Sequence, residues 1–242
     1  MGRLLQLIFA ACLVMLPVAW LKTGTLPEML PLSRALAAEP RQVEVKQAPL
    51  DVAFGGVGYH VEPAFRYALD GLVVSYKVHD ADHLLHRIWN DHLNVADLCV
   101  VWGHDAVGVD LHAFEFANGE FTCTFRTRSD QEWRAFRLDQ ISNNHLITAD
   151  PALRQRIADT AVGDQIHLEG YLASYSNASG FHRGTSTTRN DTGNGACETV
   201  NVTAFDIVDP APRGWRKLSS AALWGMLLSA SFWLIGVAKG WL

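Results

Sequence analysis

The sequence predicts a mainly β domain with some helix, a small OB-like β barrel, flanked by two transmembrane helices. Long apolar segments without charge lie near both ends of the 242-residue chain. Between them, several short runs rich in Val, Tyr, Phe and Leu alternate apolar with polar residues, as half-buried strands do. A helical stretch follows the third principal strand, where an OB-type barrel carries the helix that plugs one end.

The two apolar segments are long enough to cross a membrane. Leu4–Leu21 gives 18 residues without a charge, and Leu218–Ala238 gives 21. At about 1.5 Å per helical residue, each matches a hydrocarbon core of about 30 Å. The first segment also fits a cleavable signal peptide, because Arg3 precedes it and "ALAAEP" at 35–40 offers a cleavage pattern. The gap between segment and pattern is longer than a signal peptide normally leaves, which favours an uncleaved anchor.

We therefore expect four parts along the chain. Residues 1–22 form a transmembrane helix or signal anchor, and residues 23–53, with four prolines, form an extended stalk. Residues 54–210 form the OB-like domain, and residues 216–239 form the C-terminal transmembrane helix.

The charge pattern leaves the side of the membrane open. Lys and Arg near the helices would place the domain in the cytoplasm, but long loops cross a membrane largely regardless of charge. Three cysteines in a Trp-rich, Lys-poor domain favour an oxidising compartment, so we expect the periplasmic or external side. The net charge of −5 provides no basic face for nucleic acid, which we exclude as a partner.

The domain's elements follow from periodicity and turn signals. Apolar alternation predicts strands at 65–78, 97–103, 162–175 and 198–208. A hairpin is expected over 112–127, with Asn118 and Gly119 as its turn. Helices are expected over 80–92, from helical spacing of apolar residues, and over 150–159, which begins with an Asp-Pro capping pair.

Three histidines are weak candidates for a metal site. His79, His83 and His86 would share one face of the helix expected over 80–92, with Asp80 and Asp82 beside them. Such nitrogen and oxygen ligands suit zinc. The simpler interpretation is a solvated, histidine-rich helix face, because no CxxC or HExxH spacing is present. No cofactor is therefore expected.

The cysteines allow a structural and a catalytic interpretation. Cys99, Cys123 and Cys197 fall on different expected strands or their edges, so two of the three are expected to form a disulfide. The sequence does not choose the pair. Alternatively, Cys197 acts as a nucleophile and His145 as its base, if the fold brings them together.

The segment from Thr185 to Glu198, "TSTTRNDTGNGACE", is a long turn or a ligand site. Its glycines and hydroxyl residues are typical of a structural loop. Arg189 beside Asp191, with Glu198 at the strand entrance, could either rigidify that loop or bind an anion. An ordered scaffold is favoured over a ligand site.

Four motifs carry a resemblance to a known family. "DLCVVWG", "SNNHLITAD", "GDQIHLEGYL" and "TRNDTGNGACE", in this order over about residues 65–208, resemble a family of bacterial membrane-anchored envelope proteins. That family has no established activity. The resemblance implies a bacterial origin and one domain, and with it an inner-membrane location, but no reaction.

Two functions are consistent with these observations. The favoured one is a membrane-anchored binding or scaffold module, because a complete catalytic signature is lacking. It would hold a partner protein or small ligand through loops carrying Trp102, Asn144, His145, Arg189, Asp191 and Glu198. The alternative is an enzyme, either a hydrolase using Cys197 and His145 or a metal-dependent hydrolase using His79, His83 and His86.

Overall fold

The computed structural model describes residues 2–28, 30–80, 83–191 and 196–240. It contains two compact units: the two terminal segments, up to Pro27 and from Pro212, form one, and Glu28–Ala211 forms the other.

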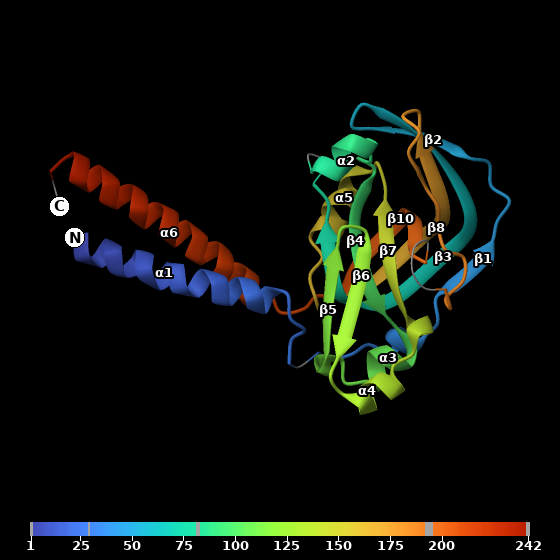
Figure 1. Ribbon diagram of the computed structural model, residues 1–242, viewed down its shortest axis with the longest axis horizontal. Helices are drawn as coiled ribbons and strands as arrows, with labels where there is room; N and C mark the ends of the chain where they lie inside the picture. Colours follow the sequence, from blue (N-terminus) through green and yellow to red (C-terminus); the bar gives the residue numbers. More distant parts are fainter. Residues whose placement is uncertain (1, 29, 81–82, 192–195, 241–242) are drawn as a thin grey trace. The chain divides into compact units, whose positions relative to one another are not determined.

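The terminal unit is a pair of long apolar helices. α1 (Gly2–Thr23) and α6 (Gly214–Ala238) pack side by side and antiparallel, with both chain ends at the same end of the pair (Figure 1). The contact is close, because a Cβ added at Gly225 would lie 2.7 Å from the Sγ of Cys12. Small residues allow such an approach between apolar helices. Both helices are long and apolar enough to span a membrane.

The other unit is mixed α/β and contains an eight-stranded mixed sheet. Its order is β1-β3-β4-β7-β10-β8-β9, and β2 pairs with β3 outside this path. All its pairings are antiparallel except that of β7 with β10, which is parallel. The strands are β1 (Arg41–Glu44), β2 (Leu50–Phe54), β3 (Val57–Val78), β4 (Asn94–Val101), β7 (Ile141–Ile147), β8 (Gln165–Asn177), β9 (His182–Arg183) and β10 (Glu198–Asp209).

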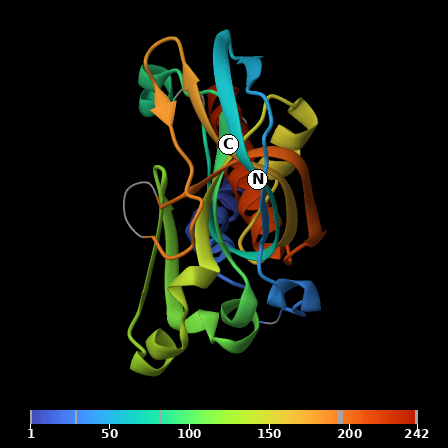
Figure 2. The ribbon, with the colours of Figure 1, turned by 90° about the vertical axis from the view of Figure 1, so that its right-hand side faces the viewer.

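This sheet closes partly on itself. The long, curved β3 pairs with β4 along its second half and also with β8 along most of its length (Figures 1 and 2). Register shifts near Pro63 and Val73 interrupt the ladders, and such bulges bend a strand. At Gly71 a Cβ would collide with Val100, so a glycine permits the close approach of β3 to β4. The interior holds apolar side chains from β3, β4, β7, β8 and β10, including Leu69, Leu98, Leu168 and Phe205.

A separate hairpin lies against this sheet. β5 (Phe114–Gly119) pairs with β6 (Thr122–Thr127), and the hairpin contacts β3, β4 and β7 (Figure 1). The disulfide between Cys99 of β4 and Cys123 of β6 fixes it there. The helices of this unit are α2 (Leu84–Trp89), α3 (Gly103–Gly108), α4 (Asp130–Ala135) and α5 (Pro151–Ala158), with 3₁₀ turns η1 (Arg34–Ala37), η2 (Leu111–Ala113) and η3 (Leu138–Gln140).

The segment expected as a stalk, residues 23–53, contributes η1, β1 and β2 instead. Leu36 is 1% exposed, and the side chain of Gln165 bonds the backbone just before this turn, accepting from the N–H of Ser33 and donating to the carbonyl of Pro31. Prolines lie between these short elements, which is why the composition indicates an extended linker although the chain packs on the domain.

Other expectations differ in position. The hairpin forms over the expected residues, but its two-residue turn is Glu120-Phe121, two residues beyond Asn118-Gly119. The segment "ISNNHLI", over which the sequence predicts no strand, is strand β7. The helix expected over 80–92 is the shorter α2. Its buried face is opposite to the expected one, because Leu84 and Ile88 are exposed while His86 is buried.

Candidate functional site

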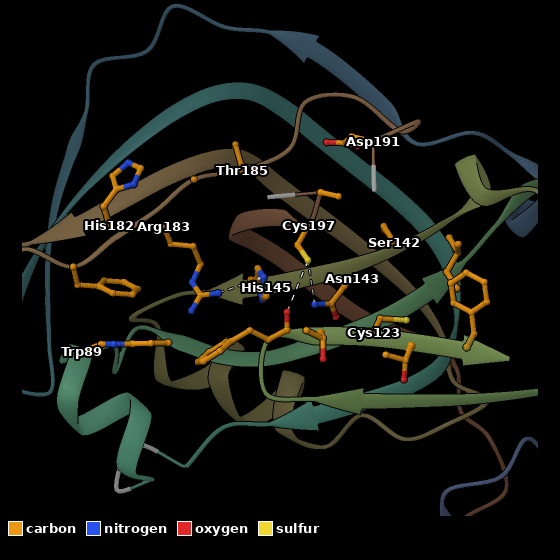
Figure 3. A pocket seen from close by; sticks show the side chains of 18 of the residues that line it. Trp89, Cys123, Ser142, Asn143, His145, His182, Arg183, Thr185, Asp191 and Cys197 are labelled. Carbon is orange, nitrogen blue, oxygen red and sulfur yellow. Dashed lines mark hydrogen bonds between the residues drawn. The ribbon is translucent and has the colours of Figure 1, made fainter. Parts of the chain in front are cut away.

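One cavity collects several chemically active side chains. It has a volume of about 1140 Å³ and is bounded by β7, the β5–β6 hairpin, α2 and the chain segments before β9 and before β10. Figure 3 shows Cys197, His145, Asn143 and Arg183 turned toward one another in it. Trp89, Phe121 and Phe181 give the wall an aromatic part.

The sheet register brings His145 beside a buried carboxylate. In the antiparallel pairing of β4 with β7, His145 lies directly opposite Asp97, so both side chains point to the same face. The Nδ1 of His145 lies 2.7 Å from the Oδ1 of Asp97. Asp97 is fully buried and His145 is 4% exposed.

Cys197 approaches this pair from β10, which begins at the next residue. Its carbonyl accepts a hydrogen bond from the backbone of Ser186 at 2.9 Å, which holds the thiol at the cavity. The Nδ2 of Asn143 lies 3.5 Å from the Sγ, and the thiol is 3.9 Å from the carbonyl of Phe121. Asn143 is two residues before His145 on the strand and therefore shares its face.

The thiol and imidazole favour an ion pair. Burial lowers the pKa of His145, but the charge and hydrogen bond of Asp97 outweigh it and raise the pKa to about 9. Burial raises the pKa of the Cys197 thiol, but the hydrogen bond and the charge of His145 lower it by more. The pKa of the thiol therefore falls below its usual value. Burial also opposes ionisation of Asp97, yet His145 and His79 hold its pKa below the usual range. Asp97 is therefore a carboxylate and His145 an imidazolium at neutral pH, and the thiol of Cys197 ionises at a lower pH than an ordinary cysteine.

Arg183 adds a second positive charge to the cavity. Its guanidinium lies over the ring of Phe121, 4.1 Å from the ring centre, and its NH1 is 3.4 Å from the Nε2 of His145. Its NH2 is 3.3 Å from the Oδ2 of Asp91, which is fully buried. A guanidinium held by an aromatic face and a carboxylate is oriented to bind an anionic group.

The structure brings together part of the predicted site. His145, Asp191 and Cys197 line the same cavity. Trp102 is fully buried and donates through Nε1 to Glu39. Asn144 is fully buried and bonds Ser142.

The long loop is anchored by contacts of its own. Arg189 donates to the carbonyl of Pro40 at 2.8 Å, and Asp191 accepts from Ser186 at 2.8 Å. Burial, reinforced by the charges of Cys197 and Asp191, raises the pKa of Glu198 to about 8, so this carboxyl is protonated at neutral pH. Residues 192–195 of the predicted loop lie outside the described residues.

The remaining candidates also have defined places. Cys99 and Cys123 form the disulfide, which leaves Cys197 free. His79 follows β3, and His83 caps α2, so the three histidines do not lie on one helix as expected. His79 and His86 nevertheless approach each other, with ring centres 4.4 Å apart. Asp82 lies outside the described residues.

Sequence reasoning missed Asp97, Asn143, Arg183 and Glu120. Asp97 had a usable signal, because it is a single charge at the start of the apolar run "LCVVW". An acid inside a buried strand requires a partner. Asn143 gives no such signal, because the sequence predicts no strand over "SNNH". Arg183 and Glu120 lie in segments where a charged residue is ordinary.

Comparison of the chain with protein-family models, with curated proteins and with solved structures finds no match.

Proposed function

We propose that this protein is a membrane-anchored, thiol-dependent hydrolase whose nucleophile is Cys197. The observation that carries the proposal is the order Cys197, His145, Asp97: a free thiol at a cavity, an imidazole that lowers its pKa, and a buried carboxylate 2.7 Å from the far imidazole nitrogen. Nucleophile, base and orienting acid in this relation define nucleophilic catalysis on several unrelated folds.

The reaction we propose is acyl transfer to water. The thiolate attacks the carbonyl carbon of an ester or amide, which forms a C–S bond and places the electron pair on oxygen. Collapse of this intermediate breaks the bond to the leaving group, which takes a proton from the His145 imidazolium. Water then gives a proton to His145 and attacks the thioester. The C–S bond breaks, and the acid is released with the thiolate and imidazolium restored.

Two further side chains have roles in this reaction. The Nδ2 of Asn143, 3.5 Å from the Sγ, can donate to the oxygen that becomes negative during attack. Arg183, at the same cavity, favours substrates that carry an anionic group near the scissile bond. Neither residue needs to change its protonation state.

The fold and location form the rest of the proposal. Strands β3, β4, β7, β10 and β8 pair in a cycle, with β7 and β10 parallel and α5 between β7 and β8 in the chain. This order supports an OB-type barrel. We place α1 and α6 in a bacterial inner membrane and the domain in the periplasm, a choice that the Cys99–Cys123 disulfide supports.

Acylation by p-nitrophenyl acetate tests the chemistry. The full chain in detergent, carrying Cys12→Ser so that Cys197 is its free thiol, should release one equivalent of p-nitrophenolate in a burst and then turn over. Mass spectrometry of the quenched burst should find the acetyl group on Cys197. His145→Gln removes the imidazolium that lowers the pKa of the thiol and should slow acylation by about 100-fold or more, on the order of a lost acid–base catalyst.

The matched control is His182→Gln, which also alters a histidine at the cavity but one that is exposed and pairs through the β8–β9 backbone. It should keep the burst. Acetylation that is absent, that falls on another residue, or that proceeds equally fast in His145→Gln would refute the hydrolase.

A binding module is the second candidate, and the cavity wall favours it. Trp89 and Phe181 stack with ring centres 6.0 Å apart beside Arg183, which suits a planar or anionic small ligand held without reaction. A ligand found by screening the Cys197→Ala variant would separate the two functions. If the wild type and Cys197→Ala bind this ligand equally tightly, and the wild type does not turn it over, the binding module is favoured.

A further inference from the structure

We infer that a second site, separate from the proposed chemistry of Cys197, binds one divalent metal ion such as zinc through His79, His86 and Glu120. One potential ligand atom from each of these residues lies within 4.8 Å of the others. They come from three places in the chain: the end of β3, the middle of α2, and the turn of the β5–β6 hairpin.

Each imidazole is fixed with its lone pair toward the same point. The Nδ1 of His86 lies 2.8 Å from the carbonyl oxygen of Asp91, which can only accept, so Nδ1 carries the proton and Nε2 the lone pair. The Nε2 of His79 lies 2.8 Å from the Oδ1 of Asp97, so its Nδ1 carries the lone pair. Acceptors behind ligand histidines hold the imidazoles of metal sites in the same way.

Among the residues that the structure describes, the three atoms that face one another have no hydrogen-bond partner. They are His79 Nδ1, His86 Nε2 and Glu120 Oε2, and all three atoms are buried. The side chain of His79 is 1% exposed, and His86 is fully buried. Buried polar atoms are nearly always satisfied, so three unsatisfied ones directed at a common point indicate a missing shared partner.

A cation satisfies all three atoms, and the spacing fits one. The Nδ1 of His79 lies 3.7 Å from an oxygen of Glu120. Two ligands of a tetrahedral zinc ion, each about 2.0–2.1 Å from it, are roughly 3.3 Å apart, so small side-chain movements suffice. Two imidazoles and a carboxylate are borderline ligands that suit Zn²⁺ better than Mg²⁺ or Ca²⁺. His83, whose Nδ1 lies 3.3 Å from Glu120, or a water molecule completes the coordination.

This metal would be structural for the cavity. The residue after Glu120 is Phe121, whose ring contacts the imidazoles of His79 and His86 and also the guanidinium of Arg183. Phe121 has a φ of 62°, a left-handed backbone that bulky residues rarely adopt. A metal held by Glu120 would fix the hairpin turn and with it this aromatic wall.

Metal binding to the full chain in detergent tests the site. Protein stripped with EDTA and dialysed should bind one Zn²⁺ per chain by elemental analysis and calorimetry, and its thermal midpoint should rise with Zn²⁺. Glu120→Gln keeps the size of the side chain and removes the charge, so it should weaken Zn²⁺ binding at least 10-fold. Glu115→Gln is the matched control, because Glu115 lies on the same hairpin but pairs with Arg126 at the surface, and it should bind like the wild type.

Cobalt distinguishes this site from the thiol. Co²⁺ bound to His79, His86 and Glu120 should lack a thiolate charge-transfer band, and Cys197→Ala should not change its affinity. Absence of stoichiometric Zn²⁺, a thiolate band, or equal affinity in Glu120→Gln would overturn the inference. None of these outcomes depends on hydrolysis by Cys197, so the two proposals fail separately.

Discussion

Asp97 connects the two candidate sites through a single oxygen atom. Its Oδ1 lies 2.7 Å from the Nδ1 of His145, 2.8 Å from the Nε2 of His79 and 3.1 Å from the Nδ2 of Asn94. Hydrogen bonds to a buried charged acceptor are stronger than neutral ones, and removing the charge leaves the donors without an adequate partner. One carboxylate in strand β4 thus orients both the imidazole beside the thiol and a potential metal ligand.

Asp97→Asn should shift the pH profile of p-nitrophenyl acetate hydrolysis. The rate of the wild type should fall only above about pH 9, where the His145 imidazolium loses its proton. Neutralising Asp97 removes the charge that stabilises the imidazolium, so the pKa of His145 should fall toward its ordinary value of about 6.5 and the descending limb should move with it. Measurement of kcat/KM from pH 5 to pH 10 checks this.

Asp70→Asn is the control for this shift, because Asp70 pairs with His167 at 2.7 Å in a half-exposed position away from the cavity. It should leave the profile unchanged. A descending limb that stays near pH 9 in Asp97→Asn would mean that this limb does not report His145.

At this scale the sequence predicted the two residues of the proposed catalytic pair, but not the residues that surround them. Cys197 after a glycine-rich loop and His145 were candidates by residue type, and the structure places both at one cavity. The placement of Asp97 and Asn143 beside His145 could not be predicted, because it depends on the pairing of β4 with β7. Register is set by long-range packing, which one local sequence does not encode.

The β5–β6 hairpin shows what could be predicted for an element. Phe and Cys residues at alternate positions predicted two strands with a short connection, but the Asn-Gly signal placed the turn two residues early. Asn118 instead accepts from Ser75 and donates to Asn143, so a tertiary contact takes the residue with the strongest turn propensity into the strand. Strand β7 was missed for a related reason: its polar residues face the site and neighbouring strands rather than solvent.

Loss of the disulfide should loosen this hairpin. Cys99 and Cys123 are 24 residues apart, and a cross-link closing a loop of that size contributes roughly 3 kcal/mol to the free energy of unfolding. The double variant Cys99→Ala, Cys123→Ala should therefore unfold at lower denaturant concentration by about that free energy. It should also bind Zn²⁺ more weakly, because Glu120 lies in the turn of the same hairpin. Urea unfolding followed by tryptophan fluorescence, with and without Zn²⁺, measures both.

Oxidised wild type and wild type treated with reductant form the matched pair here. Their difference should equal that between wild type and the double variant. A disulfide whose removal changes neither stability nor metal binding would show that the contacts with β3, β4 and β7 suffice to hold the hairpin.

At the scale of the whole molecule, the coarse fold could be predicted from the sequence, but the start of the β-rich domain could not. Apolar length identified α1 and α6, and alternation identified the central strands. Residues 28–53 belong to the compact β-rich unit, although their prolines indicate a stalk. Strands β1 and β2 have only four and five residues, so their place in the sheet depends on the partner strand β3.

The side of the membrane on which the domain lies determines whether Cys99 and Cys123 are oxidised in the cell. Gln47 is exposed between β1 and β2, so Gln47→Cys in a Cys12→Ser, Cys197→Ser background adds one accessible thiol. If the domain is periplasmic, a membrane-impermeant maleimide should label it in intact spheroplasts as fully as after lysis. The same background without Gln47→Cys should stay unlabelled unless reductant is added, because its two remaining cysteines form the disulfide. Labelling only after lysis would place the domain in the cytoplasm, where a reducing pool keeps thiols free and this disulfide would not persist.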